Sequence, residues 1–227
     1  MRPGPLCLML ALALHAPAIC AAETTRPNVD PTAQASPGPV ATLALAHELY
    51  ALGKAQGDAL TVLAAAKLAA SVGTEAGGGL KKTTTGEAVG EAGTAPPPPG
   101  AEEMFALALD LAQHDDLLSG LVLDARAATG RGRIGGAVSH DSGLAGGRTD
   151  TWEIPFKGRE YAEISVIGGG GSNLDIVVTD ENGNVICFEG GPEDVIYCDF
   201  VPVWDGFFYV AVENSGGAQN SYSLITN

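Results

Sequence analysis

Two cysteines in the last third of the chain, Cys187 and Cys198, have the spacing of a disulfide pair. Each closes a short apolar run, and the runs flank the loop at 189–194, so the sequence predicts a hairpin in which the cysteines face each other. Facing residues of an antiparallel pair lie close enough for a disulfide. Because disulfides persist in oxidising compartments, the pair also predicts that the protein is exported.

Four aspartates near predicted turns carry the oxygen atoms that calcium prefers: Asp175, Asp180, Asp199 and Asp205. The loop after Asp180 is acidic, but it lacks the alternating acids and the closing glutamate of an EF-hand. Its Asn182-Gly183 pair is first of all a hairpin turn, because both residue types tolerate positive φ. We expect calcium to bind at these aspartates weakly if at all, and we expect no other cofactor.

Two other groups of reactive residues do not predict a site. Ser139, His140 and Asp141 are neighbours in the chain, whereas a catalytic triad needs the three groups to converge from separate elements. His47 and His114 are far apart and have no third ligand beside them, which argues against a zinc site. We therefore expect no enzymatic activity.

Aromatic residues of the C-terminal third could stack on a sugar ring: Trp152, Trp204, Phe207, Phe208 and Tyr209. Alternation along a strand sends Phe207 and Tyr209 to one face and Phe208 to the other, so at least one set belongs to the core. We expect the core to take all of these residues except Trp204, which precedes a predicted turn. Trp204 is therefore the candidate binding residue.

Two kinds of element must position these residues. Over 40–129, apolar residues recur with a helical period, which predicts two helical hairpins with turns at Asp58 and Asp115. A Gly-, Thr- and Pro-rich linker over 73–100 separates the hairpins. The repeated layout is similar to tetratricopeptide-type hairpins, but a small four-helix bundle is the simpler interpretation.

Beyond a second linker at 130–149, the apolar period changes from helical to two. Gly-, Asn- and Asp-containing turns separate about seven short strands over 150–227, which is typical of a β-sandwich. The predicted fold class is α+β in separate domains, with helical hairpins before an all-β jelly-roll-like sandwich. We expect the two parts to be separately stable, because the Gly/Arg-rich run between them has little to pack.

Residues 1–22 have the pattern of a signal peptide, with basic Arg2, an apolar run and small residues up to Ala22. The apolar run is far shorter than the about 20 residues that span a bilayer, so we expect no membrane span. Cys20 lies in a poor match to a lipoprotein cleavage site, and we do not expect lipidation there. Residues 23–39 are rich in Pro, Thr and Ala, which predicts a disordered linker.

The chain has 27 acidic and 12 basic residues and a net charge of −15. Repulsion from phosphates opposes binding to nucleic acid or to an anionic membrane. The acidic residues form no long run, so they predict a dispersed acidic surface, which favours solubility and basic partners.

Five segments of the β region together resemble the bacterial pre-peptidase C-terminal domain. In chain order they are 150–156 with a D-x-aromatic start, 162–166, 174–184 with a D-x-N-G-like turn, 204–214 with an alternating aromatic and valine strand, and 222–227 with Y-x-L. The resemblance covers 150–227. It implies a jelly-roll-like sandwich of the kind appended to secreted proteases or found in cell-surface proteins. The family typically has a pair of acids near the central strand, and only Asp175 remains here, which lowers the expectation of calcium binding.

These features predict an exported, non-enzymatic binding or accessory protein of the bacterial envelope, periplasmic or secreted. Its sandwich would contact a protein or a cell-surface polymer. Two alternatives stay open: a purely structural role in secretion or stability, and a role as the accessory subunit of a hydrolase.

Overall fold

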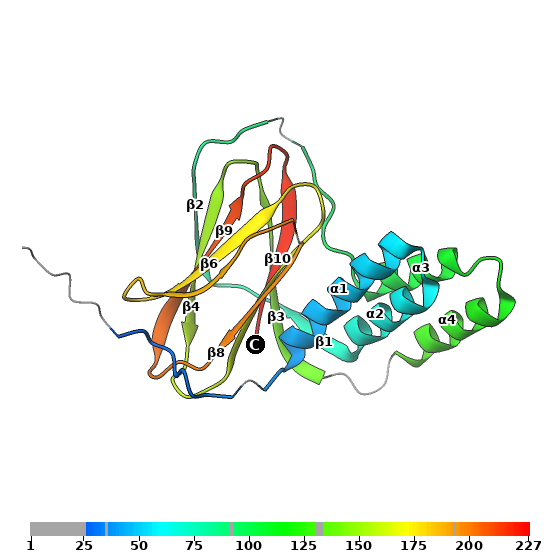
Figure 1. Ribbon diagram of the computed structural model, residues 1–227, viewed down its shortest axis with the longest axis horizontal. Helices are drawn as coiled ribbons and strands as arrows, with labels where there is room; N and C mark the ends of the chain where they lie inside the picture. The colour runs from blue at the N-terminus through cyan, green and yellow to red at the C-terminus, as the bar shows by residue number, and fades with distance from the viewer. Residues whose placement is uncertain (1–25, 35, 91–92, 130–133, 193) are drawn as a thin grey trace, which may run out of the picture.

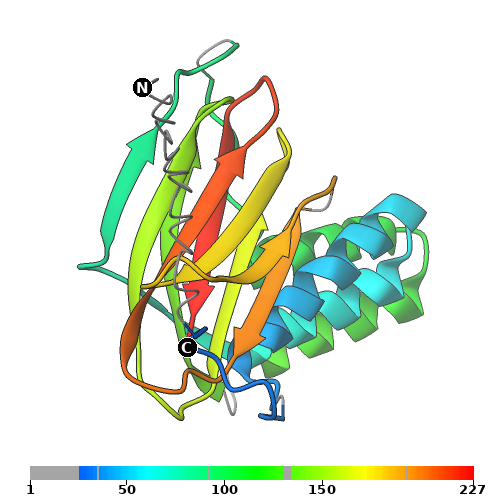
Figure 2. The ribbon, with the colours of Figure 1, turned by 60° about the vertical axis from the view of Figure 1, so that its left-hand side comes forward.

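The computed structural model describes residues 26–34, 36–90, 93–129, 134–192 and 194–227. Within these ranges it contains four helices beside a sandwich of two sheets (Figures 1 and 2), which confirms the predicted α+β fold class. The helices are α1 (Pro39–Gln56), α2 (Ala59–Ser71), α3 (Ala101–Leu111) and α4 (Asp116–Ala128). The strands are β1 (Val72–Ala76), β2 (Lys81–Thr85), β3 (Ile134–Leu144), β4 (Thr149–Phe156), β5 (Ala162–Gly168), β6 (Leu174–Asp180), β7 (Val185–Glu189), β8 (Val195–Phe200), β9 (Gly206–Asn214) and β10 (Asn220–Thr226).

The two sheets interleave strands that are distant in the chain. Sheet A has the order β1-β3-β10-β5-β8, and sheet B has the order β2-β4-β9-β6-β7. Neighbouring strands run antiparallel, except that β1 and β3 are parallel. Apart from the β6–β7 hairpin, neighbouring strands within a sheet are not consecutive in the chain, so each sheet depends mainly on pairing between distant segments.

The core of the sandwich follows the period of two. Leu174, Ile176 and Val178 of β6 point inward and are almost fully buried, while the residues between them are partly exposed. Strand β5 differs, because all of its residues are buried. The reason is that α1 packs on β5, β8 and β3, so the helices cover the outer face of sheet A (Figure 2).

The turns of the helical half match the prediction from the sequence. Asp58 caps α2 by accepting a hydrogen bond from the backbone N–H of Leu60, and Asp115 caps α4 by accepting one from Leu118. Gly57 ends α1 with a φ of 65°, a left-handed conformation that glycine adopts without strain. None of the described helices is long and apolar enough to cross a membrane.

Two segments that the sequence predicts to be linkers form strands of the sandwich. The predicted linker at 73–100 contains most of β1 and all of β2, which are edge strands of sheets A and B. The predicted linker at 130–149 contains β3. These boundaries were wrong because an edge strand needs only backbone hydrogen bonds to its neighbour: β2 reads Lys-Lys-Thr-Thr-Thr and has no apolar side chain.

The helical half and the sandwich share one interface through α1. Its apolar members come from both parts: Val40, Leu43, Val72, Ala137, Ile167 and Ile225. Buried Glu163 of β5 adds a polar contact, since its Oε1 accepts hydrogen bonds of 2.9 and 3.1 Å from the backbone N–H groups of Gly38 and Ala41. These N–H groups at the start of α1 have no partner within the helix, so a strand of the sandwich caps a helix of the other part.

The segment before α1 is held against the sandwich. Asn28 is fully buried, and its backbone N–H donates to Asp180 at 2.8 Å. Its side-chain oxygen accepts from the backbone N–H groups of Val203 and Trp204 at 2.9 and 3.0 Å. The prediction of a disordered linker is therefore wrong for residues 26–34, because the hydrogen bonds of Asn28, together with packing of Val29 on the sandwich core, fix the segment. The predicted signal peptide, with Cys20, lies outside the described residues.

Candidate functional site

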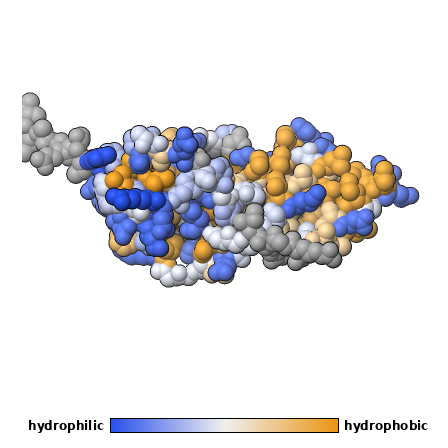
Figure 3. Space-filling model, turned by 90° about the horizontal axis from the view of Figure 1, so that it is seen from below, coloured by the Kyte–Doolittle hydropathy of each residue, from blue (hydrophilic) through white to orange (hydrophobic). Residues whose placement is uncertain are grey.

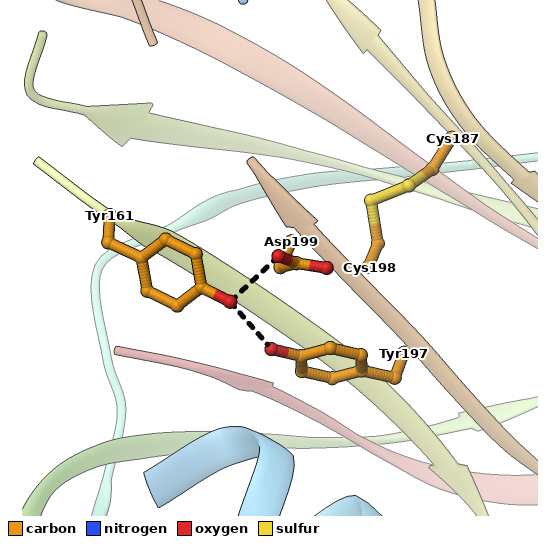
Figure 4. Close-up of a disulfide and its surroundings, with 5 residues drawn as sticks. All are labelled: Tyr161, Cys187, Tyr197, Cys198 and Asp199. Atoms are coloured by element: carbon orange, nitrogen blue, oxygen red, sulfur yellow. Dashed lines mark hydrogen bonds between the residues drawn. A yellow bond between two sulfur atoms is a disulfide. The ribbon is translucent and has the colours of Figure 1, made fainter. Parts of the chain in front are cut away.

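Cys187 and Cys198 form the disulfide predicted from the sequence (Figure 4). Their strands are not partners: β7 pairs with β6 in sheet B, and β8 pairs with β5 in sheet A. The two Cα atoms are 6.3 Å apart across the space between the sheets. The predicted hairpin register is therefore wrong. The chain changes sheets after β7, and the disulfide joins the two edge strands on one side of the sandwich.

The four aspartates considered for calcium are spread over the sandwich. Asp175 and Asp180 lie at opposite ends of β6. Asp199 lies in β8 of the other sheet and accepts a 2.7 Å hydrogen bond from the hydroxyl of Tyr161 (Figure 4), while Asp205 accepts from a backbone N–H. Among the described residues, no group of three or more His, Cys, Asp or Glu could hold a metal ion. The structure does not bring the predicted ligands together.

Asp180 has a structural role in the turn after β6. Its carboxylate is almost fully buried and accepts hydrogen bonds from N–H groups of Asn28, Asn182 and Asn184. Burial acts to raise the pKa of Asp180, but these hydrogen bonds outweigh it and lower the pKa. The ionised carboxylate thus shapes the predicted Asn182-Gly183 turn and anchors Asn28.

Trp204 is exposed, as the sequence predicts, with 37% of its surface accessible. Its indole Nε1 donates a 2.5 Å hydrogen bond to Glu181, and its backbone carbonyl accepts one of 3.1 Å from the side chain of Asn28. Trp204 therefore joins the N-terminal segment to the turn after β6, and its indole N–H is already engaged.

The Ser-His-Asp run in β3 is not a triad. Ser139 and Asp141 share one face of the strand and bond to each other at 3.1 Å. His140 points to the other face, where it is nearly buried beside Trp152 with ring centroids 5.6 Å apart. Burial lowers the pKa of His140, although the charge of Asp141 opposes this. His47 lies in α1, far in the chain from His114 in the turn between α3 and α4.

The outer face of sheet B is the surface of the sandwich that the helices leave uncovered (Figure 1). We call it the open face. Its apolar and aromatic side chains lie on three neighbouring strands: Val177 on β6, Val185 and Phe188 on β7, and Phe207, Tyr209 and Ala211 on β9. Polar residues of β2 and β4 border these side chains. They are threonines and the Lys81–Glu153 ion pair, whose charged atoms are 2.9 Å apart.

Strand pairing makes the apolar part of the open face continuous. Val177 lies opposite Phe188 on one neighbouring strand and opposite Ala211 on the other. Phe188 is 66% exposed, Val185 61% and Phe207 47%. The solvent face of an antiparallel sheet is ordinarily polar, and contiguous exposed apolar residues mark an interaction site. The open face is therefore the candidate binding surface of the sandwich.

This surface was not predicted from the sequence. Phe208 and Trp152 are core residues as predicted, but Phe207 and Tyr209 were also expected in the core, and they lie on the open face instead. The signal that could have shown it is the unbroken apolar run of β9, which supplies apolar residues to both faces of one strand. Alternation along a strand shows which side chains share a face of the sheet, but it does not show whether other elements cover one face or both.

Apolar side chains are also exposed over the helical half, where they gather on the face seen in Figure 3. Leu117 of α4 is the most exposed of them, at 86%, and Leu121 and Leu123 of the same helix are half exposed. Helix α4 buries only Val122 almost completely, so it packs loosely on the other helices.

No protein-family model matches this sequence, and no curated protein matches it. Several solved structures are similar to part of the chain, among them the following two. The pre-peptidase C-terminal domain of a collagenase from Bacillus anthracis has a TM-score of 0.35 and 21% sequence identity, and the match covers 39% of this chain and 87% of that one. PliG from Aeromonas hydrophila, a periplasmic inhibitor of g-type lysozyme, has a TM-score of 0.29 and 17% identity, with 40% and 84% covered. The similarity of the helical half to tetratricopeptide-type hairpins is not confirmed.

Proposed function

We propose that this protein is an exported, non-enzymatic binding protein whose sandwich contacts a protein or polymer partner through the open face. The observation that carries the proposal is the continuous apolar row formed by exposed Phe188 and partly exposed Val177 and Ala211 across an uncovered sheet. Exposing such side chains to water gains nothing for folding, so their burial against a partner is a favourable source of binding energy.

The disulfide supports this surface directly. Cys187 lies between exposed Val185 and Phe188 on edge strand β7, and it ties that strand to β8. A short edge strand held this way loses little conformational entropy when a partner binds, and pre-organisation of this kind improves affinity. The disulfide therefore holds in place the strand that carries the most exposed apolar side chains of the face.

The disulfide also supports the proposed location. A bond of this kind persists in the periplasm or outside the cell, which agrees with the signal-peptide pattern of residues 1–22. The net charge of −15 favours a partner with basic groups around an apolar patch. We assign the protein to the periplasm or to the secreted fraction of a bacterial cell.

The experiment compares the mature chain with the double variant Val185→Ser/Phe188→Ser. Immobilised protein is exposed to a periplasmic extract and, separately, to purified cell-wall polymer. Partner retention should be lost in the double variant, because its apolar row is broken. The matched control is Leu117→Ser, which removes an even more exposed apolar side chain from α4 and should retain the partner.

Two outcomes contradict the proposal. Equal retention by the wild type and the double variant, with both folded by circular dichroism, excludes the open face. Turnover in a broad hydrolase screen by the purified chain excludes a non-enzymatic role. If the retained partner is a hydrolase, the protein acts as an accessory subunit, which is the more specific alternative.

A further inference from the structure

A cavity of about 450 Å³ lies between α1, the proline run at 96–99 and the edge of sheet A. Ile167 and Val195 of sheet A contribute its apolar floor, and Pro98 and Pro99 form part of the opposite wall. A second hollow beside it shares His47 and the same two prolines. The cavity lies on the helix-covered side of the sandwich, so it is separate from the open face.

The proline wall is fixed in place on the sandwich. The hydroxyl of Ser221 donates a 2.8 Å hydrogen bond to the carbonyl of Ala95, just before the run. The run also passes so close to Gly169 that a Cβ atom there would collide with the carbonyl of Pro96. Proline restricts the backbone before any ligand arrives, so the cavity is pre-formed at little entropic cost.

Five polar side chains line this apolar cavity: Asp194 from the edge of the sandwich, and four from the helices. His47, Tyr50 and Lys54 follow one another at three- and four-residue intervals, which places them on one face of α1. Glu103 comes from the first turn of α3. Among the described residues, none of the four forms a hydrogen bond or an ion pair with another side chain. Their hydrogen-bonding groups are therefore available to a ligand.

The charged groups of Lys54 and Glu103 lie near the ring of Tyr50 and do not form an ion pair with each other. The Lys54 ammonium is 5.9 Å from the centroid of the Tyr50 ring. Burial, and then the charge of Glu103, raise the pKa of Tyr50, so the carboxylate acts on this ring as well. Both charged side chains are exposed at the mouth, whereas Ile167 at the floor is fully buried. The mouth thus presents a cation and an anion above an apolar interior.

We infer that this cavity binds a small zwitterion with an apolar side chain, either a free apolar amino acid or a dipeptide of such residues. The ligand carboxylate pairs with Lys54, and the ligand ammonium pairs with Glu103. The ligand side chain packs on Ile167, Val195 and the prolines. Cavities of this size, apolar with a few convergent polar groups, are typical of small-ligand sites. His47 adds a hydrogen-bonding group that is neutral at neutral pH.

Isothermal titration of the mature chain tests the inference. The probes are leucine, leucyl-leucine, N-acetyl-leucine, leucinamide and N-acetyl-leucinamide at millimolar concentration. Leucine or leucyl-leucine should bind about three- to five-fold more tightly than each singly charged analogue, which is the expected contribution of one partly exposed ion pair. The comparison of leucine with leucyl-leucine decides which length of ligand fits.

Two variants assign the ends of the ligand. Lys54→Met should remove the preference for a free carboxylate, and Glu103→Gln should remove the preference for a free ammonium. Lys67→Met and Asp110→Asn change exposed charges of the same helical half that do not line the cavity, and they should bind like the wild type. The inference is overturned if no zwitterion binds, if all five probes bind equally, or if the cavity variants behave like the controls.

Discussion

The carboxylate of Asp150 accepts a 2.7 Å hydrogen bond from the hydroxyl of Tyr222 in the space between the two sheets. Asp150 belongs to β4 of sheet B and Tyr222 to β10 of sheet A, and both are fully buried. Three more donors reach the same carboxylate: the hydroxyls of Thr84 and Ser142 and the ammonium of Lys82, at 2.5, 3.0 and 3.0 Å. One buried acid therefore links both sheets and edge strand β2.

Replacing Asp150 by Asn should lower the free energy of unfolding by about 3 kcal/mol, because the buried hydroxyl of Tyr222 and the ammonium of Lys82 lose the charge of their shared carboxylate partner. The matched control is Glu153→Gln on the same strand, whose partner Lys81 belongs to the same β2 but lies in solvent. The control should change stability little, since exposed ion pairs contribute little. Denaturant titration measures both variants. Equal losses would show that burial of the Asp150 carboxylate does not matter.

Asp150 should also make the protein sensitive to acid. Burial acts to raise the pKa of Asp150, but hydrogen bonds from Thr84, Tyr222 and Lys82 outweigh it and lower the pKa below the ordinary value of 3.8. With the folded pKa below the unfolded one, the carboxylate stabilises the fold fully above pH 3.8 and loses this contribution as the pH falls further. Stability measured against pH should fall less steeply in this range for Asp150→Asn than for the wild type.

The double substitution Cys187→Ser/Cys198→Ser should destabilise the protein by about 3 kcal/mol in the chain-entropy model. The melting temperature should fall by several degrees, and reduction of the wild type should have the same effect. Because the bond joins two sheets, its loss should increase amide exchange in β7 (Val185–Glu189) more than in β4. Two free thiols in the native protein, counted without reductant, would contradict the disulfide.

The shared interface at α1 indicates that the helical half and the sandwich unfold together, whereas the sequence predicts two separately stable parts. Glu163→Ala should cost about 2 kcal/mol, because it leaves the N–H groups of Gly38 and Ala41 and the hydroxyl of Tyr197 without their acceptor. The control is Asp58→Ala, which removes a helix cap supplied from within the helical half. Far-UV dichroism and tryptophan fluorescence should give coincident transitions. Limited proteolysis that releases a folded sandwich would restore the prediction of separate domains.

His47 gives a second pH dependence. Burial lowers the pKa of His47 from 6.5 to about 4, so the unfolded chain takes up a proton before the folded one does. The stability contributed by neutral His47 is complete above pH 6.5 and declines as the pH falls towards 4. His47→Gln should flatten the stability profile in this window. The His47 imidazole should keep the NMR shifts of its neutral form at pH 5, and titration near pH 6.5 in the folded protein would contradict the prediction.

Local sequence patterns determined the elements that depend on nearby residues. Asp58 and Asp115 mark helix starts because a capping side chain bonds to an N–H group two or three positions away. The alternation of β6 likewise indicated which of its residues are buried. The placement of Cys187 and Cys198 on either side of the loop at 189–194 likewise identified the disulfide pair.

Tertiary structure alone decided which segments meet. The polar strand β2 and the buried Asn28 are held by hydrogen bonds to residues far along the chain, and such bonds leave no apolar period in the sequence. The sequence also could not show that Cys187 and Cys198 lie in different sheets, because that depends on the backbone pairing of β7 with β6 and of β8 with β5. The open face and the cavity beside His47 likewise exist only because helices cover one sheet and not the other. That choice is made by packing between distant elements, which neither composition nor periodicity records.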